Sequence, residues 1–287
     1  MVAPRRAFSL QLPNGQALAL GDRTLVMGIV NVTPDSFADG GRRFAPDAAI
    51  AGALAMAHAG ADLIDIGAES TRPGADPLPA DEELARLVPV LQGLRGRLKI
   101  PVSVDTYKAA VADRAIDLGA ALVNDVSALT LDPAMSEVVA RRGVPVVLMH
   151  TRGRSRDMYA LAKYTDPAGE VASELAERLA AAESAGIPRS RIILDPGLGF
   201  AKRAEHSLAV LAGLPRIAGL GCPLLVGPSR KSFLTAALGD VPPDHRDWGT
   251  AAAVTAASLL GAHIVRVHGV AEMVDVVRVA DAIRARG

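Results

Sequence analysis

The sequence predicts an α/β fold, a single (β/α)8 TIM barrel, from three observations. Eight short apolar segments recur along the chain, each segment leads to a polar or charged residue, and helical stretches fill the intervals. Alternating strands and helices indicate a parallel sheet, and polar side chains at the carboxyl ends of barrel strands are typical of an active site. No linker or change of composition divides residues 1–287, so we expect one domain.

An N-terminal extension, residues 1–22, is expected to precede the barrel. Residues 7–20 form two short apolar segments around Asn14-Gly15. Asn-Gly is a strong hairpin signal, because both residues tolerate the positive φ of a type I′ turn. We therefore expect a β-hairpin that plugs the amino-terminal end, or bottom, of the barrel.

The remaining elements follow in order along the chain. We expect strands at residues 24–31, 62–67, 101–105, 121–125, 144–149, 191–195, 223–227 and 263–267. We expect helices at residues 46–59, 80–96, 108–118, from Pro133 onward, 167–185, 205–218, from Lys231 onward, 249–260 and 270–285. Several strands are rich in Val, Ile and Leu without strict alternation, as parallel strands covered by helices are. Glycines follow several of the helices, where the left-handed conformation of a helix C-cap favours glycine.

Composition and charge exclude several classes of partner. Lys plus Arg and Asp plus Glu both total 31, and aromatic residues make up only 3% of the chain. Without a basic excess or aromatic platforms, we expect no nucleic-acid partner. The N-terminus lacks a signal peptide and no apolar stretch is long enough to span a bilayer, so we expect a cytoplasmic protein without a membrane partner. The single cysteine, Cys222, excludes an internal disulfide.

Three strand-end residues are candidates for binding a flat heterocycle. Asp105, Asn124 and Asp195 end three of the predicted strands, so their side chains can converge at the barrel mouth. Two carboxylates and an amide suit a ring that carries an amino group, a ring N–H and a carbonyl. Each residue alone could equally cap the next helix, but three in one barrel mouth favour a site.

Basic residues after the last two strands are candidates for binding an anion. Lys231 follows the seventh strand, and Arg266 and His268 share a face of the eighth. The loops after these strands often form a phosphate site in barrels, and Ser229-Arg230-Lys231 is expected to open a helix whose free N–H groups also favour anions. Asn31 could give Mg²⁺ one hard oxygen ligand beside phosphate oxygens.

Eight longer motifs resemble the dihydropteroate synthase family. They are GIVNVTPDSFADGG (28–41), DIGAESTRPGA (65–75), SVDT (103–106), VNDVS (123–127), LMHTRG (148–153), LDPGLGFAK (194–202), GPSRKSF (227–233) and RVHGV (266–270). They run in order from about residue 24 to the C-terminus and touch all eight predicted strands. Ala68 is a small departure, because the family commonly has a second glycine there.

The resemblance implies that 4-aminobenzoate displaces pyrophosphate from a pterin methyl diphosphate to give 7,8-dihydropteroate, and that Asp105, Asp195, Lys231 and Arg266 act in catalysis. The implied pterin pocket consists of Asp105, Asn124, Met149, Asp195 and Lys231. The implied 4-aminobenzoate side consists of Phe37, Thr71, Arg72, Pro73, Phe200 and Ser229. Asn31, with Mg²⁺, and Arg266 and His268 match the diphosphate contacts, and Asp35 matches a mobile loop. The family also implies a homodimer and sensitivity to sulfonamides.

Two other functions remain open at this point. A pterin-dependent methyl transfer to a corrinoid protein would use the same barrel and a similar set of Asp, Asn and Asp. It would leave the Ser229-Arg230-Lys231 segment and the TPDSF and STRPG loops unexplained. A catalytically silent paralogue that only binds a pterin should have lost some of Asn31, Lys231 and Arg266, and all three are present.

Overall fold

The computed structural model describes residues 2–33, 45–71 and 74–287, and within them eight parallel strands form a barrel. The strands are β3 (Leu25–Asn31), β4 (Leu63–Gly67), β5 (Val102–Asp105), β6 (Leu122–Asp125), β7 (Val146–Met149), β8 (Ile192–Asp195), β9 (Leu225–Val226) and β10 (Ile264–Val267). Their order around the sheet is β8-β7-β6-β5-β4-β3-β10-β9. A parallel bridge between Leu194 and Leu224 links the two outer strands, so the sheet closes and the predicted barrel is confirmed.

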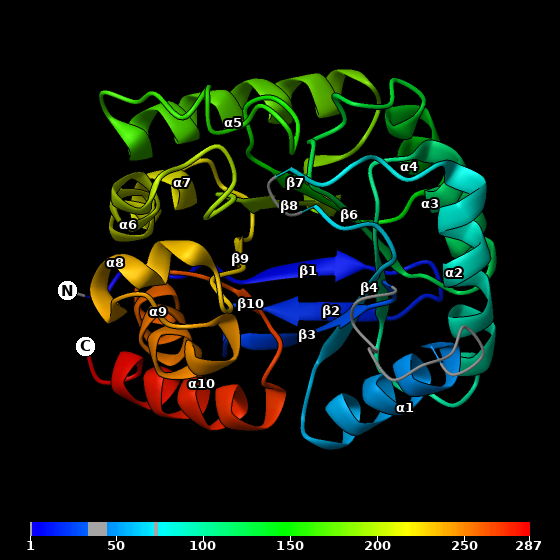
Figure 1. The fold of residues 1–287 in the computed structure, drawn as a ribbon, viewed down its shortest axis with the longest axis horizontal. Coiled ribbons are helices and arrows are strands. Elements are labelled where there is room, and N and C mark those ends of the chain that lie inside the picture. The colour runs from blue at the N-terminus through cyan, green and yellow to red at the C-terminus, as the bar shows by residue number, and fades with distance from the viewer. Residues whose placement is uncertain (1, 34–44, 72–73) are drawn as a thin grey trace.

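Helices form a ring around the strands, and the hairpin lies across the centre of that ring (Figure 1). They are α1 (Ala45–His58), α2 (Ala80–Leu94), α3 (Ala109–Asp117), α4 (Met135–Arg142), α5 (Pro167–Ser184), α6 (Ala204–Ala212), α7 (Leu214–Ala218), α8 (Thr235–Leu238), α9 (Asp247–Leu259) and α10 (Val270–Arg284). Short 3-10 turns cover η2 (Arg189–Arg191), η3 (Ser232–Leu234) and η4 (Pro243–His245). No helix in the described ranges is long and apolar enough to cross a membrane.

The predicted N-terminal hairpin is present and closes the bottom of the barrel. Strands β1 (Phe8–Gln11) and β2 (Ala17–Leu20) pair antiparallel. Leu10 and Leu20 pack into an apolar cluster with inward-facing residues from the barrel strands. This contact removes the lower barrel layer from water, which the barrel alone would leave open at that end.

The turn of this hairpin is not the expected type I′ turn. Gly15 has a φ of +81°, but Asn14 is not among the described residues with positive φ. Leu12 O accepts a hydrogen bond from Gly15 N at 3.0 Å, so residues 12–15 form a type I turn that ends in a left-handed glycine. Pro13 explains the difference, because its ring holds φ near −65°, as the second position of a type I turn requires.

Alternation along the strands divides the side chains between two cores. Residues such as Met27, Leu63, Leu122 and Ile193 fill the lower barrel interior, while their neighbours such as Val26 face the surrounding helices. Because side chains at i and i+2 share a face, the inward positions continue upward to the strand ends. Asn31, Asp65, Asp105, Asn124, Met149, Asp195 and Arg266 therefore belong to the same inward set as the apolar layer below them.

Three predicted elements are shorter or more broken than expected. The helix expected at 205–218 is interrupted at Gly213, because Pro215 near the start of α7 cannot continue the hydrogen bonding of α6. The strand expected at 223–227 has only the two residues of β9. The helix expected from Lys231 is a 3-10 turn followed by the four-residue α8.

Ala68, where the family commonly has glycine, is fully buried in the outer core, so its extra methyl group is accommodated.

Candidate active site

Four side chains from four strands form a continuous polar layer at the carboxyl end of the barrel. Asp65 on β4 is fully buried, and its Oδ2 accepts hydrogen bonds from Asn124 Nδ2 at 2.9 Å and Arg266 Nε at 2.6 Å. Nη2 of the same arginine donates to Asp105 Oδ2 at 2.7 Å. The structure thus brings Asp105 and Asn124 together as predicted and joins them through Asp65, which the sequence reasoning had not selected.

Burial dominates the electrostatics of this layer. It raises the pKa of Asp105 to about 7, against the opposing effect of the Arg266 guanidinium. The nearby carboxylates, Asp65 first among them, raise the same pKa further. Asp65 Oδ1 is also buried and has no hydrogen-bond partner within the described ranges. Since buried acceptors are almost always paired, an unpaired acceptor here fits a site that receives N–H donors from a ligand.

Asp195 and Lys231 form the opposite side of the mouth. Asp195 ends β8 beside Met149, which is buried at the end of β7 and is its neighbour in the sheet register. Burial raises the pKa of Asp195, and the positive charge of Lys231 counteracts that rise. Burial likewise lowers the pKa of Lys231 to about 8, with Asp195 opposing. The two residues therefore stabilise each other's charged forms in a poorly solvated place.

The Lys231 ammonium also contacts the loop that follows β8. Its Nζ donates to Leu198 O at 2.6 Å and lies 4.6 Å from the centroid of the Phe200 ring. Gly199 has a φ of +80°, and a Cβ there would lie 3.2 Å from Lys231 Cδ. This close approach explains the glycine in the LDPGLGFAK segment.

His268 and Ser229 lie together after β10 and β9. Ser229 Oγ accepts from His268 N at 3.1 Å and is 2.9 Å from His268 Nδ1, so the two side chains are connected. The fifteen-residue helix α10 begins two residues after His268. The expected helix at Ser229-Arg230-Lys231 is reduced to a 3-10 turn, and a turn that short cannot supply a strong helix dipole. The helix N-terminus at this edge of the site is therefore that of α10.

Asn31 is the only candidate metal ligand among the predicted residues. It ends β3, where its register partner is Gly67 of β4, and it is partly exposed. The described residues contain no group of three or more His, Cys, Asp or Glu side chains suited to a metal ion. One neutral amide oxygen therefore fits a Mg²⁺ that arrives with phosphate oxygens, not a closed all-protein metal site.

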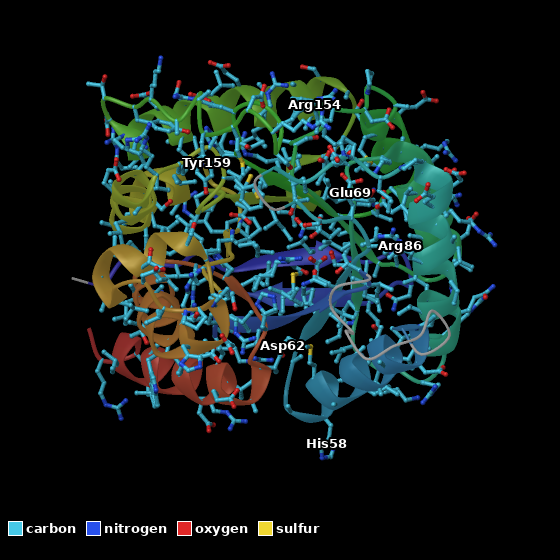
Figure 2. All side chains as sticks on the ribbon, viewed as in Figure 1. His58, Asp62, Glu69, Arg86, Arg154 and Tyr159 are labelled. Atoms are coloured by element: carbon cyan, nitrogen blue, oxygen red, sulfur yellow. The ribbon has the colours of Figure 1, made fainter. Side chains whose placement is uncertain are left out.

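A cavity of about 310 Å³ opens beside the mouth and includes part of the predicted 4-aminobenzoate side. Thr71 and Phe200 line it together with Glu69 and Arg154, which Figure 2 labels. Glu69 is fixed by Tyr107, whose hydroxyl donates to its Oε1 at 2.8 Å. Ser229, also predicted for this side, does not line this cavity. The remaining predictions for this side and its loop, namely Asp35, Phe37, Arg72 and Pro73, lie outside the described residues.

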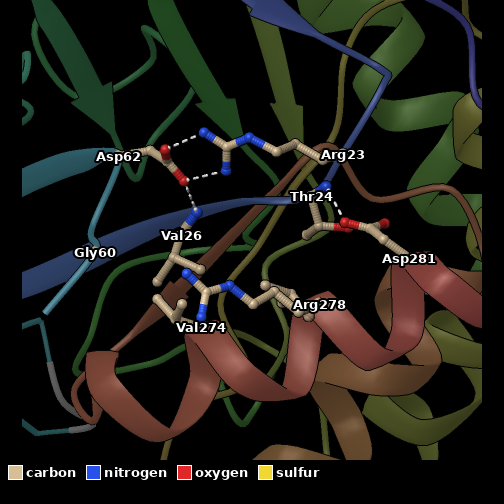
Figure 3. Close-up of a pocket in the computed structure, with 9 residues that line it drawn as sticks. Arg23, Thr24, Val26, Gly60, Asp62, Val274, Arg278 and Asp281 are labelled. Atoms are coloured by element: carbon tan, nitrogen blue, oxygen red, sulfur yellow. Dashed lines mark hydrogen bonds and ion pairs between the residues drawn. The ribbon is translucent and has the colours of Figure 1, made fainter.

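A second cavity, of about 460 Å³, lies at the bottom of the barrel beside α10 (Figure 3). Arg23 forms an ion pair with Asp62, and Asp62 Oδ2 also accepts from Val26 N at 2.9 Å. Thr24 Oγ1 donates to Asp281 Oδ1 at 2.9 Å. Its other charged groups are also paired, Asp281 with Arg5 and Arg278 with Asp275. The cavity lies at the opposite end of the barrel from the polar layer.

Two functional candidates in the structure had not been predicted, Asp65 and Lys202. A carboxylate within the otherwise apolar LIDIG segment, two residues before the strand end, was a usable signal for Asp65. Lys202 is almost fully buried, whereas lysine is mostly exposed in proteins. The sequence pattern offered no signal for that burial.

The chain matches the family model described as pterin binding enzyme over residues 27–268. That range includes every barrel strand except the first two residues of β3, so the chain belongs to the family of pterin binding enzymes. The two strand-end carboxylates and the amide described above lie within the match.

The relatives narrow this class. A dihydropteroate synthase of Synechocystis is 47% identical over 277 residues, 96% of each chain. A Xanthomonas albilineans dihydropteroate synthase solved with 4-aminobenzoic acid is 45% identical, with a TM-score of 0.91 over 98% of this chain and 99% of that one. A Yersinia pestis dihydropteroate synthase solved with a sulfonamide drug is 42% identical, with a TM-score of 0.90 over 97% and 100%.

Within the family, the chain groups with the dihydropteroate synthases, the transferases of folate biosynthesis that join a pterin group to 4-aminobenzoate.

Proposed function

We propose that this chain condenses 6-hydroxymethyl-7,8-dihydropterin diphosphate with 4-aminobenzoate through an ionised pterin cation. The observation that carries the proposal is the buried polar layer of Asp65, Asp105, Asn124 and Arg266, with Asp195 across the mouth. Carboxylates and an amide at one mouth match the amino group, ring N–H and carbonyl of a pterin. The product is 7,8-dihydropteroate, and pyrophosphate is released.

The carboxylates account for the cationic character of the reaction. Cleavage of the C–O bond leaves positive charge that the electron-rich pterin ring delocalises. Ionised Asp105 and Asp195 stabilise that charge in a site of low polarity, where fixed charges act more strongly than in water. Asn124, Met149 and Lys231 complete the pterin pocket, in which Asn124 is oriented by its hydrogen bond to Asp65.

The diphosphate leaving group binds at the β10 side of the mouth. Arg266 and His268 contact the diphosphate, and the N-terminus of α10 adds N–H groups that favour an anion. Asn31 gives one oxygen ligand to Mg²⁺, which supplies Lewis-acid stabilisation of the departing oxygens when bound. Arg266 is held by two carboxylates, so its guanidinium is fixed in place before the diphosphate arrives.

The 4-aminobenzoate side needs no strong base, because an arylamine is already nucleophilic near neutral pH. Phe37, Thr71, Arg72, Pro73, Phe200 and Ser229 form this side. The loops at 32–45, which includes Asp35, and at 68–79 close to exclude water that would otherwise trap the cation. Sulfonamides compete for the same subsite.

The protein works in the cytoplasm as a homodimer, with the apolar helix α9 as the proposed contact face.

A substrate-omission assay tests this function. Purified protein is incubated with the pterin diphosphate, 4-aminobenzoate and Mg²⁺, and both dihydropteroate and pyrophosphate are followed. We expect equimolar products that require both substrates and that decrease with chelator. Asn31→Ala should raise the Mg²⁺ concentration needed for half-maximal rate. Pterin binding without product would instead support a methyltransferase or a silent paralogue.

A further inference from the structure

Lys202 occupies an unusual environment behind the mouth of the barrel. It ends the loop that follows β8, and only 1% of its surface is exposed. Within the part of the chain that the structure describes, four acceptor atoms surround its Nζ, and none belongs to a carboxylate. They are His150 Nδ1 at 2.8 Å, Gly197 O and Phe200 O at 3.0 Å, and His150 O at 3.3 Å. No step of the proposed reaction uses this lysine.

The hydrogen bonds around His150 favour a charged Lys202, whereas burial acts in the other direction and lowers the pKa of this lysine well below its usual value. His150 Nε2 lies 3.0 Å from Glu174 Oε2, and Arg152 pairs with the same carboxylate. His150 and Arg152 lower the pKa of Glu174 to about 2, so Glu174 is an acceptor only. His150 must then carry its proton on Nε2, which leaves Nδ1 as an acceptor for a Lys202 N–H. A neutral amine would have two N–H groups for four acceptors, whereas the ammonium has three.

The loop that Lys202 holds is conformationally strained. Ala201 has a φ of +48°, which is uncommon for a residue other than glycine. Gly197 has a φ of +64°, and a Cβ there would lie 2.0 Å from His150 O. The carbonyls of Gly197, Phe200 and His150 converge on one point, and a positive charge between them offsets their mutual repulsion.

The same loop carries three groups of the site. Gly197 N donates to Asp195 Oδ1 at 2.7 Å, Leu198 O accepts from Lys231 Nζ at 2.6 Å, and the Phe200 ring lies under Lys231. A change in the loop would therefore move Lys231 and rotate the Asp195 carboxylate together. We propose that Lys202 is a positioning residue whose buried side chain fixes the loop at residues 196–201 and thereby orients Asp195 and Lys231, an inference that rests on the proposed function.

Several charged side chains act on Asp195 and on Lys202. Lys231, Arg266 and Lys202 act on Asp195, and all three favour its ionised form. Burial is the main cause that lowers the pKa of Lys202. The charges of Asp195 and Glu174 oppose that shift, and those of Lys231 and Arg152 add to it. Removing Lys202 takes away one of the three cations that act on Asp195. The carboxylate should then accept a proton at a higher pH than in the native enzyme.

The test replaces Lys202 with methionine, which has a similar length and no charge. In the Lys202→Met protein we expect kcat/KM for the pterin diphosphate to fall about tenfold at pH 6, because protonation of Asp195 then adds to that of Asp105 on the acid limb. The loss should become smaller as the pH rises toward 8. The Lys202→Arg protein keeps the charge and should retain the native acid limb.

Leu175→Ala is the matched control, because Leu175 is fully buried on α5 and lies outside the hydrogen-bond network of Lys202. It should lower Tm and leave the pH profile in place. A Lys202→Met profile that coincides with that of the native enzyme would overturn the proposal. If the native protein made no dihydropteroate, the proposed function itself would fail, so the two failures are distinguishable.

A second measurement uses the native protein and does not depend on a stable variant. Nitrogen-15 NMR of the lysine side chains distinguishes an ammonium from a neutral amine. At pH 7 we expect a buried, slowly exchanging NH3⁺ signal that the Lys202→Arg substitution removes. A neutral amine assigned to Lys202 at this pH would contradict the role of its charge.

Discussion

The two ends of the barrel interior are built from opposite kinds of side chain on the same faces of the same strands. At the bottom, Met27 and Leu63 pack with Leu10 and Leu20 of the hairpin in an apolar cluster. Two to four residues further along the strands, the inward positions are Asp65, Asp105, Asn124 and Arg266, linked by hydrogen bonds. One end excludes water completely, and the other holds ionisable groups in an environment of low polarity.

This difference shows how stability and function are separated along each strand. Burial of apolar surface at the bottom contributes favourable free energy, whereas buried charges at the top contribute little or cost stability even when they are paired. The hairpin matters because it lets the lower layer be fully buried. The rigid lower half can then hold the strand ends of the upper half in register.

Arg266→Met should have the largest effect, because it removes the cation between Asp65 and Asp105. We expect loss of measurable turnover and a decrease in the free energy of unfolding of roughly 3–5 kcal/mol, since breaking a buried pair leaves uncompensated charge. Steady-state kinetics and urea denaturation measure the two quantities. Adding Asp65→Asn should recover part of the stability but none of the activity. Normal turnover in Arg266→Met would contradict the role of the layer.

Met27→Ala removes apolar side-chain volume at the bottom of the same barrel, away from the polar layer. It leaves a cavity in a fully buried layer and should decrease the free energy of unfolding by about 2–5 kcal/mol. Below the unfolding transition, KM for both substrates should be unchanged. Leu10→Ala on the hairpin should reproduce this result. A large change in KM from either variant would show that the two ends are coupled more tightly than we infer.

The pH dependence of kcat/KM tests the polar end of the barrel alone. Activity requires ionised Asp105, whose pKa is raised to about 7, and protonated Lys231, whose pKa is lowered to about 8. The value of kcat/KM should therefore fall as the pH drops through 7 and again as it rises through 8. Lys231→Arg should remove the alkaline decline, because a guanidinium stays charged in this range. A flat profile between pH 6 and 9 would count against both assignments.

Arg23→Ala should have the smallest effect. Its ion pair with Asp62 lies at the bottom rim, and the arginine side chain is 60% exposed. Surface pairs contribute roughly 0–1 kcal/mol, so we expect a Tm decrease of at most a few degrees and native kinetics. Differential scanning calorimetry at low and high salt measures this contribution. A loss of turnover would mean that the cavity shown in Figure 3 takes part in function.

Much of the fold could be predicted because barrel strands carry a strong local pattern. The polar residue that ends an apolar segment marked Asp105, Asn124 and Asp195, and the structure places all three at the barrel mouth. The expectation was wrong in two segments. The turn at Asn14-Gly15 was decided by Pro13, and the segment after Lys231 forms only short helical turns.

The sequence by itself determined the order of strands and helices, the hairpin at the N-terminus and the identity of the polar residues at the strand ends. Short-range propensities and the two-residue period of a strand are sufficient for these features. Only the tertiary structure decided that Arg266 pairs with Asp65, 201 residues away, and that Lys202 is buried among carbonyl oxygens. Such pairings depend on the register of a closed barrel, which no local segment contains.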